Sequence, residues 1–192
     1  MKPESYYYNC SPAYIKSISP DLHSQVIETI EVLPKRETQS DINFDLFWLL
    51  TSVGWSYDTV PAGMPKIPPE CFSLDCTLED LKPKNLRMPC LTSETLQTKW
   101  HADFAKQFDT GLVQIEAQFG KVEALFKDFC GFRIVYAERR LALGIELVLV
   151  DPASYFSHRK KSFGEMASFK VAMDMLNTIG LDCPIWLVGI KD

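Results

Sequence analysis

The spacing of hydrophobic positions in the first part of the chain predicts helices followed by a hairpin. Apolar residues recur at helical intervals over residues 21–33, after a capping aspartate, and again over residues 41–53, where Gly54 supplies the stop. Residues 101–121 instead alternate apolar and polar side chains around a short Asp109-Thr110 turn. Such alternation on both sides of a tight turn is typical of two antiparallel strands.

The second half of the chain switches between the helical and the extended pattern. Residues 121–139 show helical spacing, and residues 141–150 form a near-continuous apolar run, as expected for a strand buried on both faces. Residues 162–179 begin with capping-box spacing and predict a further helix, and residues 184–190 predict a closing strand. This order favours an α/β fold with a mixed central sheet flanked by helices.

Two segments give no regular pattern. Residues 1–20 are aromatic and polar without a clear period, and we expect an arm or a poorly ordered start. Between residues 57 and 98 repeated prolines exclude long regular elements, so we expect a loop-rich connection with a short helix near 78–81. A long irregular connection inside a compact domain is often functional.

The composition indicates one globular domain over residues 1–192. The chain is 46% hydrophobic and 23% charged, and its length suits a single buried core rather than two. No run reaches the length of a membrane span and the first residues lack the apolar stretch of a signal peptide, so we expect a cytoplasmic protein with reduced cysteines. Cys71, Cys76 and Cys90 are spaced poorly for the usual zinc sites, which leaves zinc a minor alternative.

The predicted hairpin gathers acidic and amide side chains on one face. A turn that pairs Phe108 with Gly111 places Asp103 opposite Glu116, with Cβ atoms roughly 5 Å apart. The same register places His101 opposite Gln118. The other face carries apolar side chains that we expect to face a core, namely Ala102, Phe104, Val113, Ile115, Ala117 and Phe119.

Two carboxylates at that separation indicate a metal site. They repel each other unless a cation lies between them or one of them is protonated. Oxygen ligands on a rigid scaffold suit Mg²⁺, which completes its shell with water and substrate phosphate. The alternative is an exposed sheet face that carries chance acids, but Gln118 on the same face favours a functional site. A bulge in the hairpin would shift the register and make Asp109, in the turn, the competing ligand.

The residues of this hairpin resemble a known family. The segment DFAK at 103–106, followed by LVQIEAQFGK at 112–121, is similar to the active-site hairpin of the BglII and BstYI type II restriction endonucleases. In that family D-F-x-K and a short turn precede a strand ending in E-x-Q-F-G-K, a variant of the D…E-x-K nuclease signature with Gln in place of Lys. The resemblance covers most of residues 20–192, most strongly 101–150, and the turn here is longer by about four residues.

The resemblance implies a restriction-endonuclease-like core and a Mg²⁺-dependent nuclease centre. Asp103 and Glu116 would ligate the ion together with the backbone carbonyl of Ala117. Glu116 and Gln118 would orient or activate the attacking water. Because an amide has no titratable lone pair at neutral pH, the part played by Gln118 must be positional, and Glu116 is the better candidate for proton transfer.

The resemblance also implies contacts with double-stranded DNA. A net charge of −5 counts against a nucleic-acid binder, but local charge matters more than the total. The positions that correspond to the family's sequence-reading residues are basic or polar here: Lys121, His158, Arg159, Lys160, Lys161 and Ser162. Arg and Lys pair with guanine in the major groove. The resemblance therefore implies a palindromic DNA target that is read by a two-fold symmetric homodimer. The family's targets are centred on GATC, but the basic loop differs here, so the same site is not carried over.

Other functions and roles remain open at this point. The protein is alternatively a DNA-binding or accessory subunit with an inactive centre, or a carboxylate-pair hydrolase of another substrate such as a sugar. His101 either contacts a phosphate or is an ordinary hydrogen-bonded residue. Glu146 interrupts the apolar run at 141–150, and we expect a structural role in which Arg133 or Arg140 is its partner.

Overall fold

The computed structural model describes residues 1–58, 101–156 and 166–192. Within these ranges the helices are α1 (Pro12–Ile18), α2 (Leu22–Val32), α3 (Gln39–Ser52), α5 (Val122–Ala137), α6 (Pro152–Tyr155) and α7 (Phe169–Ile179). The strands are β1 (Lys2–Tyr8), β2 (Ser56–Tyr57), β3 (Phe104–Phe108), β4 (Gly111–Ala117), β5 (Leu141–Leu149) and β6 (Ile185–Lys191).

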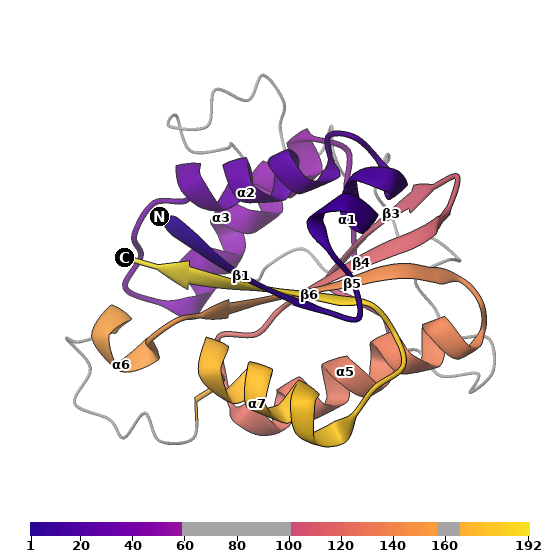
Figure 1. Ribbon diagram of the computed structural model, residues 1–192. Coiled ribbons are helices and arrows are strands. Elements are labelled where there is room, and N and C mark those ends of the chain that lie inside the picture. Colours follow the sequence, from indigo (N-terminus) through magenta and orange to yellow (C-terminus); the bar gives the residue numbers. More distant parts are fainter. Residues whose placement is uncertain (59–100, 157–165) are drawn as a thin grey trace.

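The strands form one mixed sheet in the order β1-β6-β5-β4-β3-β2. The central strands β4, β5 and β6 run parallel, while β1 and β3 pair antiparallel with their neighbours. Helices α1, α2 and α3 cover one face of the sheet and α5 and α7 cover the other (Figure 1). The predicted mixed sheet flanked by helices is therefore confirmed.

The sheet is buried on both faces because each face packs against helices. All nine residues of β5 are buried, which matches its near-continuous apolar sequence. One core cluster joins the sheet to α1, α2 and α3 through residues such as Ile30 and Trp48. A second cluster joins the opposite face to α5 and α7 through Phe129 and Leu176. Polar side chains on either face of the central strands therefore lie inside the protein.

The two predicted N-terminal helices are observed as α2 and α3. Asp21 precedes α2, but its side chain makes no capping hydrogen bond. The cap of α3 is Thr38, whose side chain accepts a hydrogen bond from the Asp41 backbone N–H. Gly54 follows α3 with a φ of +86°, a conformation that glycine adopts without strain.

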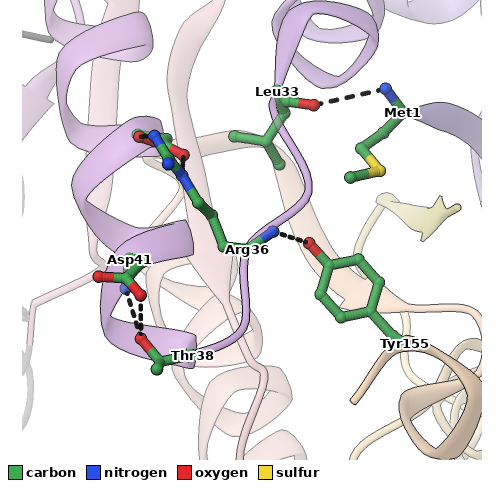
Figure 2. A network of polar contacts seen from close by, with 7 residues as sticks. Met1, Leu33, Arg36, Thr38, Asp41 and Tyr155 are labelled. Carbon is green, nitrogen blue, oxygen red and sulfur yellow. Dashed lines mark hydrogen bonds and ion pairs between the residues drawn. The ribbon is translucent and has the colours of Figure 1, made fainter. Parts of the chain in front are cut away.

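The loop between α2 and α3 is fixed by polar contacts (Figure 2). The Arg36 guanidinium donates to both carboxylate oxygens of Asp45, at 2.6 and 3.0 Å. The backbone N–H of Arg36 donates to the Tyr155 hydroxyl of α6 at 3.2 Å. Asp45 is only 1% exposed, so this ion pair compensates a buried charge and ties α3 to the loop before it.

The expectation for residues 1–20 is wrong, because this segment is ordered and contains β1 and α1. β1 pairs antiparallel with β6 over its whole length, from Lys2 with Lys191 to Tyr8 with Ile185. Tyr7 stacks on Trp186 at a centroid distance of 6.0 Å, and the Tyr8 hydroxyl donates to the Leu181 carbonyl. The partners that order β1 lie at the other end of the chain, so local sequence pattern did not reveal it.

The C-terminal part needs a smaller correction. The final helix begins at Phe169 with Ser168 as its cap, rather than at the capping-box spacing of 162–165. Residues 157–165, and the loop-rich connection predicted between 57 and 98 from residue 59 onward, lie outside the described ranges. Among the helices of the described ranges, none is long and apolar enough to cross a membrane.

Candidate active site

The hairpin of β3 and β4 has the predicted register. Phe108 pairs with Gly111 across the turn, and the pairing continues without a shift to Phe104 and Ile115. β4 does have a register irregularity near its start, but it lies in the pairing with β5. The bulge that would have moved the acids by one residue is therefore absent from the described hairpin.

The two faces of the hairpin pack against different helices. Phe104, Val113 and Ile115 belong to the core cluster under α1, α2 and α3, as predicted. The opposite face carries Gln114 and Glu116, which are 0% and 5% exposed. The polar face is thus not a solvated surface but an internal one, and its polar groups must find partners inside the protein.

Asp103 and Glu116 are brought together at the open end of the hairpin. The Ala117 backbone N–H donates to Asp103 Oδ2 at 3.0 Å. In the opposite direction, the Asp103 backbone N–H lies 3.4 Å from Glu116 Oε2. These two contacts fix both carboxylates relative to the two strands. Asp109 lies in the turn, a strand length away, so the geometry favours Asp103 over Asp109 as the partner of Glu116.

The site is rich in negative charge. Burial raises the pKa of Glu116 well above its usual range, and the charges of Asp103 and Asp128 raise it further. Desolvation also raises the pKa of Asp103, although the hydrogen bond from Ala117 opposes the shift. The Asp103 residue itself reaches the surface, whereas Glu116 does not. Lys127 lowers both pKa values without reversing either shift. The pair therefore favours a proton or a cation between its oxygens.

Gln118 lies one residue beyond the end of β4 and is held by the protein at both ends of its amide. Its Oε1 accepts a hydrogen bond from the Gly120 backbone N–H at 2.9 Å. Its Nε2 donates to Asp128 Oδ2 at 3.3 Å. The Gln118 backbone N–H donates to the Leu147 carbonyl of β5, which anchors the residue to the central sheet.

Asp128 of α5 is a site residue that the sequence analysis missed. It is 3% exposed, and burial raises its pKa to about 6 against the opposing effects of Gln118 and Lys127. A signal was present in the sequence, because Asp128 occupies the same helical face as the buried residues Leu125, Phe129 and Phe132. A charged residue in the middle of a core-facing stripe needs a partner, and here that partner is Gln118.

The prediction that Arg133 or Arg140 pairs with Glu146 is wrong. Arg133 pairs with Asp182 at 2.5 Å, and Arg140 pairs with Glu138 at 2.9 Å. Arg140 precedes β5 and lies six positions before Glu146 along an extended chain, a distance of about 20 Å, which exceeds the reach of its side chain.

Glu146 instead lies inside the acidic cluster. It is the register partner of Glu116 in the neighbouring strand. It is 0% exposed, and both of its carboxyl oxygens lack a hydrogen-bond partner among the described residues. Burial raises the pKa of Glu146 well above its usual range, and the charges of Asp128, Glu116 and Asp103 add to the effect.

The remaining predicted residues lie around this centre or outside the described ranges. The side chain of His101 is 8% exposed, and its Nδ1 lies 3.8 Å from Asp58 Oδ1. Lys121 is exposed at the start of α5 and forms an isolated antiparallel bridge with Met166. The basic segment His158, Arg159, Lys160, Lys161 and Ser162 falls outside the residues that the structure describes.

The donors at the hairpin end fit a hard divalent cation. The described residues contain no group of three or more His, Cys, Asp or Glu side chains arranged to hold a metal ion. Mg²⁺ needs no such group, because it usually takes one or two carboxylates and completes its shell with water and substrate phosphate. The buried Glu116 Oε1 has no hydrogen-bond partner within the described ranges, which is consistent with a ligand role.

Comparisons with known proteins place the chain in a family. Residues 4–190 match the family of restriction endonuclease BglII/BglIII. No curated protein sequence matches the chain. Among solved structures, the restriction endonuclease BglII in complex with a DNA 16-mer is similar with a TM-score of 0.64 and 16% sequence identity, over 100% of this chain and 77% of that chain. At this identity the structural likeness shows the fold, and that fold is the mixed sheet flanked by helices described above. Because the family match spans nearly the whole sequence, the chain belongs to the restriction endonuclease BglII/BglIII family and is a type II site-specific nuclease.

Proposed function

We propose that this protein is a Mg²⁺-dependent endonuclease that cuts both strands of double-stranded DNA at a short palindromic sequence and acts as a homodimer. The observation that carries the proposal is the contact between the Asp103 carboxylate and the end of β4. Ala117 donates to Asp103 at 3.0 Å, and Glu116 lies beside it with one carboxyl oxygen unpartnered among the described residues. Type II restriction endonucleases generally use a divalent metal ion, and this pair is where we place it.

Each residue of the centre has a distinct part in phosphodiester hydrolysis. Asp103, Glu116 and the Ala117 carbonyl would hold Mg²⁺, which when bound neutralises charge on the phosphoryl oxygens and on the leaving 3′ oxygen. Glu116 would accept the proton of the attacking water, because it is a buried carboxylate at this position and the neighbouring Gln118 amide cannot accept a proton. Gln118 orients that water through its amide, since it has no titratable group.

The DNA contacts are assigned to basic residues near this centre. Lys121 is exposed three positions beyond Gln118, at the start of α5, where an ammonium reaches a phosphate or a base edge. The basic residues His158, Arg159, Lys160 and Lys161, with Ser162, would contribute further contacts, and arginine or lysine pairing with guanine would give sequence specificity. A palindromic site presents the same sequence to two symmetric subunits, so each subunit of a homodimer would cut one strand.

The activity is tested with the purified protein and phage DNA. We expect discrete fragments in the presence of Mg²⁺ and none in the presence of a chelator. Sequencing the fragment ends identifies the site and the cut position. Intact DNA over a range of Mg²⁺ and Mn²⁺ concentrations would show that the protein is a DNA-binding relative with an inactive centre. A cytoplasmic location is part of the same proposal, because the DNA substrate is found there.

The assignment of the residues is tested with three variants. Asp103→Ala and Glu116→Ala are expected to abolish cleavage while specific DNA binding, measured by gel shift in Ca²⁺, is largely retained. Asp109→Ala removes the turn carboxyl of the same hairpin and serves as the matched control, which should remain active. Full activity of either of the first two variants, or loss of activity in the control, would contradict the assignment.

A further inference from the structure

The amide of Gln118 has one orientation that suits both of its partners. Asp128 is an acceptor when ionised, and the Gly120 backbone N–H is a donor, so they select the nitrogen and the oxygen of the amide respectively. A flipped amide would bring Nε2 against an N–H group and Oε1 against a carboxylate. Both hydrogen bonds would then become repulsive contacts. The two partners therefore fix the orientation of the amide.

The Gly120 side of this arrangement is rigid. The Gly120 carbonyl accepts a hydrogen bond from the Ala167 backbone N–H at 2.9 Å. The preceding Phe119 carbonyl accepts a hydrogen bond from the Gln39 side chain at the start of α3. A Cβ atom at position 120 would lie 2.9 Å from Gln118 Oε1, so glycine leaves room for the amide to approach.

The Asp128 side is held by the core. Asp128 is 3% exposed and lies on the face of α5 that packs against the sheet through Leu125, Phe129 and Phe132. The helix cannot move its carboxylate without disturbing this packing. Gln118 is thus held between the backbone of the strand end and a side chain that the opposite layer of the fold supplies.

We infer that Asp128 is a positioning residue of the nuclease centre, which aims the remaining N–H and lone pair of the Gln118 amide at the reacting water and phosphate. This inference rests on the proposed function, in which Gln118 orients the water. It assigns a function to the Asp128 carboxylate of α5, which the hairpin alone does not explain. It also accounts for the residue type at position 118, because an acidic partner there suits either the amide of Gln or the ammonium of the Lys that the D…E-x-K signature usually has at this position.

A purely structural role for Asp128 fits the structure less well. Burial raises the pKa of Asp128 to about 6, so its surroundings disfavour the ionised form despite the hydrogen bond from Gln118. A residue that served only the fold would be expected to stabilise it. Removing the carboxylate should therefore leave the free energy of unfolding unchanged or raise it at neutral pH.

A double-mutant cycle tests the inference. Asp128→Ala is expected to lower kcat about 10- to 100-fold with KM within about threefold of wild type, the usual effect of losing a group that orients a ligand or catalytic residue. In a Gln118→Ala background the same change should alter kcat by less than about twofold, because the amide it positions is gone. Asp128→Asn keeps an acceptor oxygen and should recover most of the activity. Equal losses from Asp128→Ala in both backgrounds, or no loss in either, would overturn the inference.

A second measurement needs neither metal nor DNA. The side-chain amide signals of Gln118 are assigned in the ¹H–¹⁵N spectrum of the metal-free protein by their absence in Gln118→Ala. In Asp128→Ala the chemical shifts of these signals should move to the values of a solvent-exposed amide. They should stay in place in Asp174→Asn, which removes an exposed partner of Lys170 on α7. Unmoved signals in folded Asp128→Ala would refute the inference, whereas Asp128→Asn, which keeps an acceptor oxygen, should leave them close to their wild-type positions. A wild-type protein that cuts no DNA would refute the proposed function instead, and the spectra would still decide whether Asp128 holds the amide.

Discussion

Replacing Glu146 with Gln should change how the stability of the protein depends on pH. Glu146 is fully buried, both of its oxygens are unpartnered among the described residues, and the nearby acids Glu116, Asp128 and Asp103 add to the burial effect that raises its pKa. The folded protein therefore keeps Glu146 protonated at pH values where the unfolded chain ionises it. Gln has nearly the same shape and is always neutral, so Glu146→Gln imitates the protonated form and leaves the other acids close to their present state.

The size of the effect follows from the linkage between protonation and folding. Above the ordinary pKa of 4.5, the unfolded chain has released the proton that the folded protein still holds. The contribution of Glu146 to the free energy of unfolding of the wild type then falls by about 1.4 kcal/mol for each pH unit, until the raised folded pKa is reached. The Glu146→Gln variant lacks this pH-dependent loss of stability, because Gln does not ionise. The variant should equal the wild type near pH 4.5 and exceed its stability by at most about 2.7 kcal/mol two pH units higher.

Urea denaturation of the metal-free proteins between pH 4.5 and 8 measures this difference. Wild type and Glu146→Gln are compared at each pH in the presence of a chelator, and Glu123→Gln, an exposed acid in the first turn of α5, serves as the control. We expect a growing gap between Glu146→Gln and wild type, and no gap for the control. Parallel stability curves for wild type and Glu146→Gln would show that Glu146 ionises normally. The cost of burying its charge would then be offset by an interaction that is absent among the described residues.

Three further outcomes are expected. Gly144→Ala should lower the free energy of unfolding by about 1–3 kcal/mol in urea, because the new Cβ would lie 2.7 Å from the ring of Phe132 and force the helix and the sheet apart. Arg36→Met should lower it by about 3 kcal/mol at pH 7, since Asp45 would be left as a buried charge without its guanidinium partner. Mg²⁺ or Mn²⁺ at about 100 times its dissociation constant should raise the free energy of unfolding by about 2.7 kcal/mol, seen as a higher melting temperature. Glu116→Ala should lose that increase, and an equal increase in the variant would place the ion elsewhere.

The hairpin shows how far the local sequence can predict a site. Alternating side chains and a turn fix the pairing of Phe104 with Ile115. That register places Asp103 beside Glu116 without the help of any other helix or strand. The prediction was correct because the side-chain period of a strand is two, so one turn position determines every facing pair. The same reasoning separated Asp103 from Asp109, which the turn keeps a strand length away.

Predictions that depended on distant partners were less reliable. β1 was missed because its tyrosines are ordered by β6 and by the segment before it, about 180 residues later in the chain. The start of α7 was placed too early because a capping pattern at 162–165 resembles the cap that Ser168 provides. Arginines were assigned to Glu146 because they are near in sequence, although an extended strand carries Arg140 far from it.

The strand register, the pair of acids at the hairpin end and the amide beside them could be derived from the sequence alone. These follow from local periodicity, in which each side chain's direction depends only on its own strand. The surroundings of that pair depend on how the helices and strands pack together. Packing α5 on the sheet brings Asp128 to Gln118, and the parallel pairing of β4 with β5 sets Glu146 beside Glu116. Those contacts join separate elements across layers and strands, so the charge and burial that shape the chemistry of the centre arise only when the chain has folded.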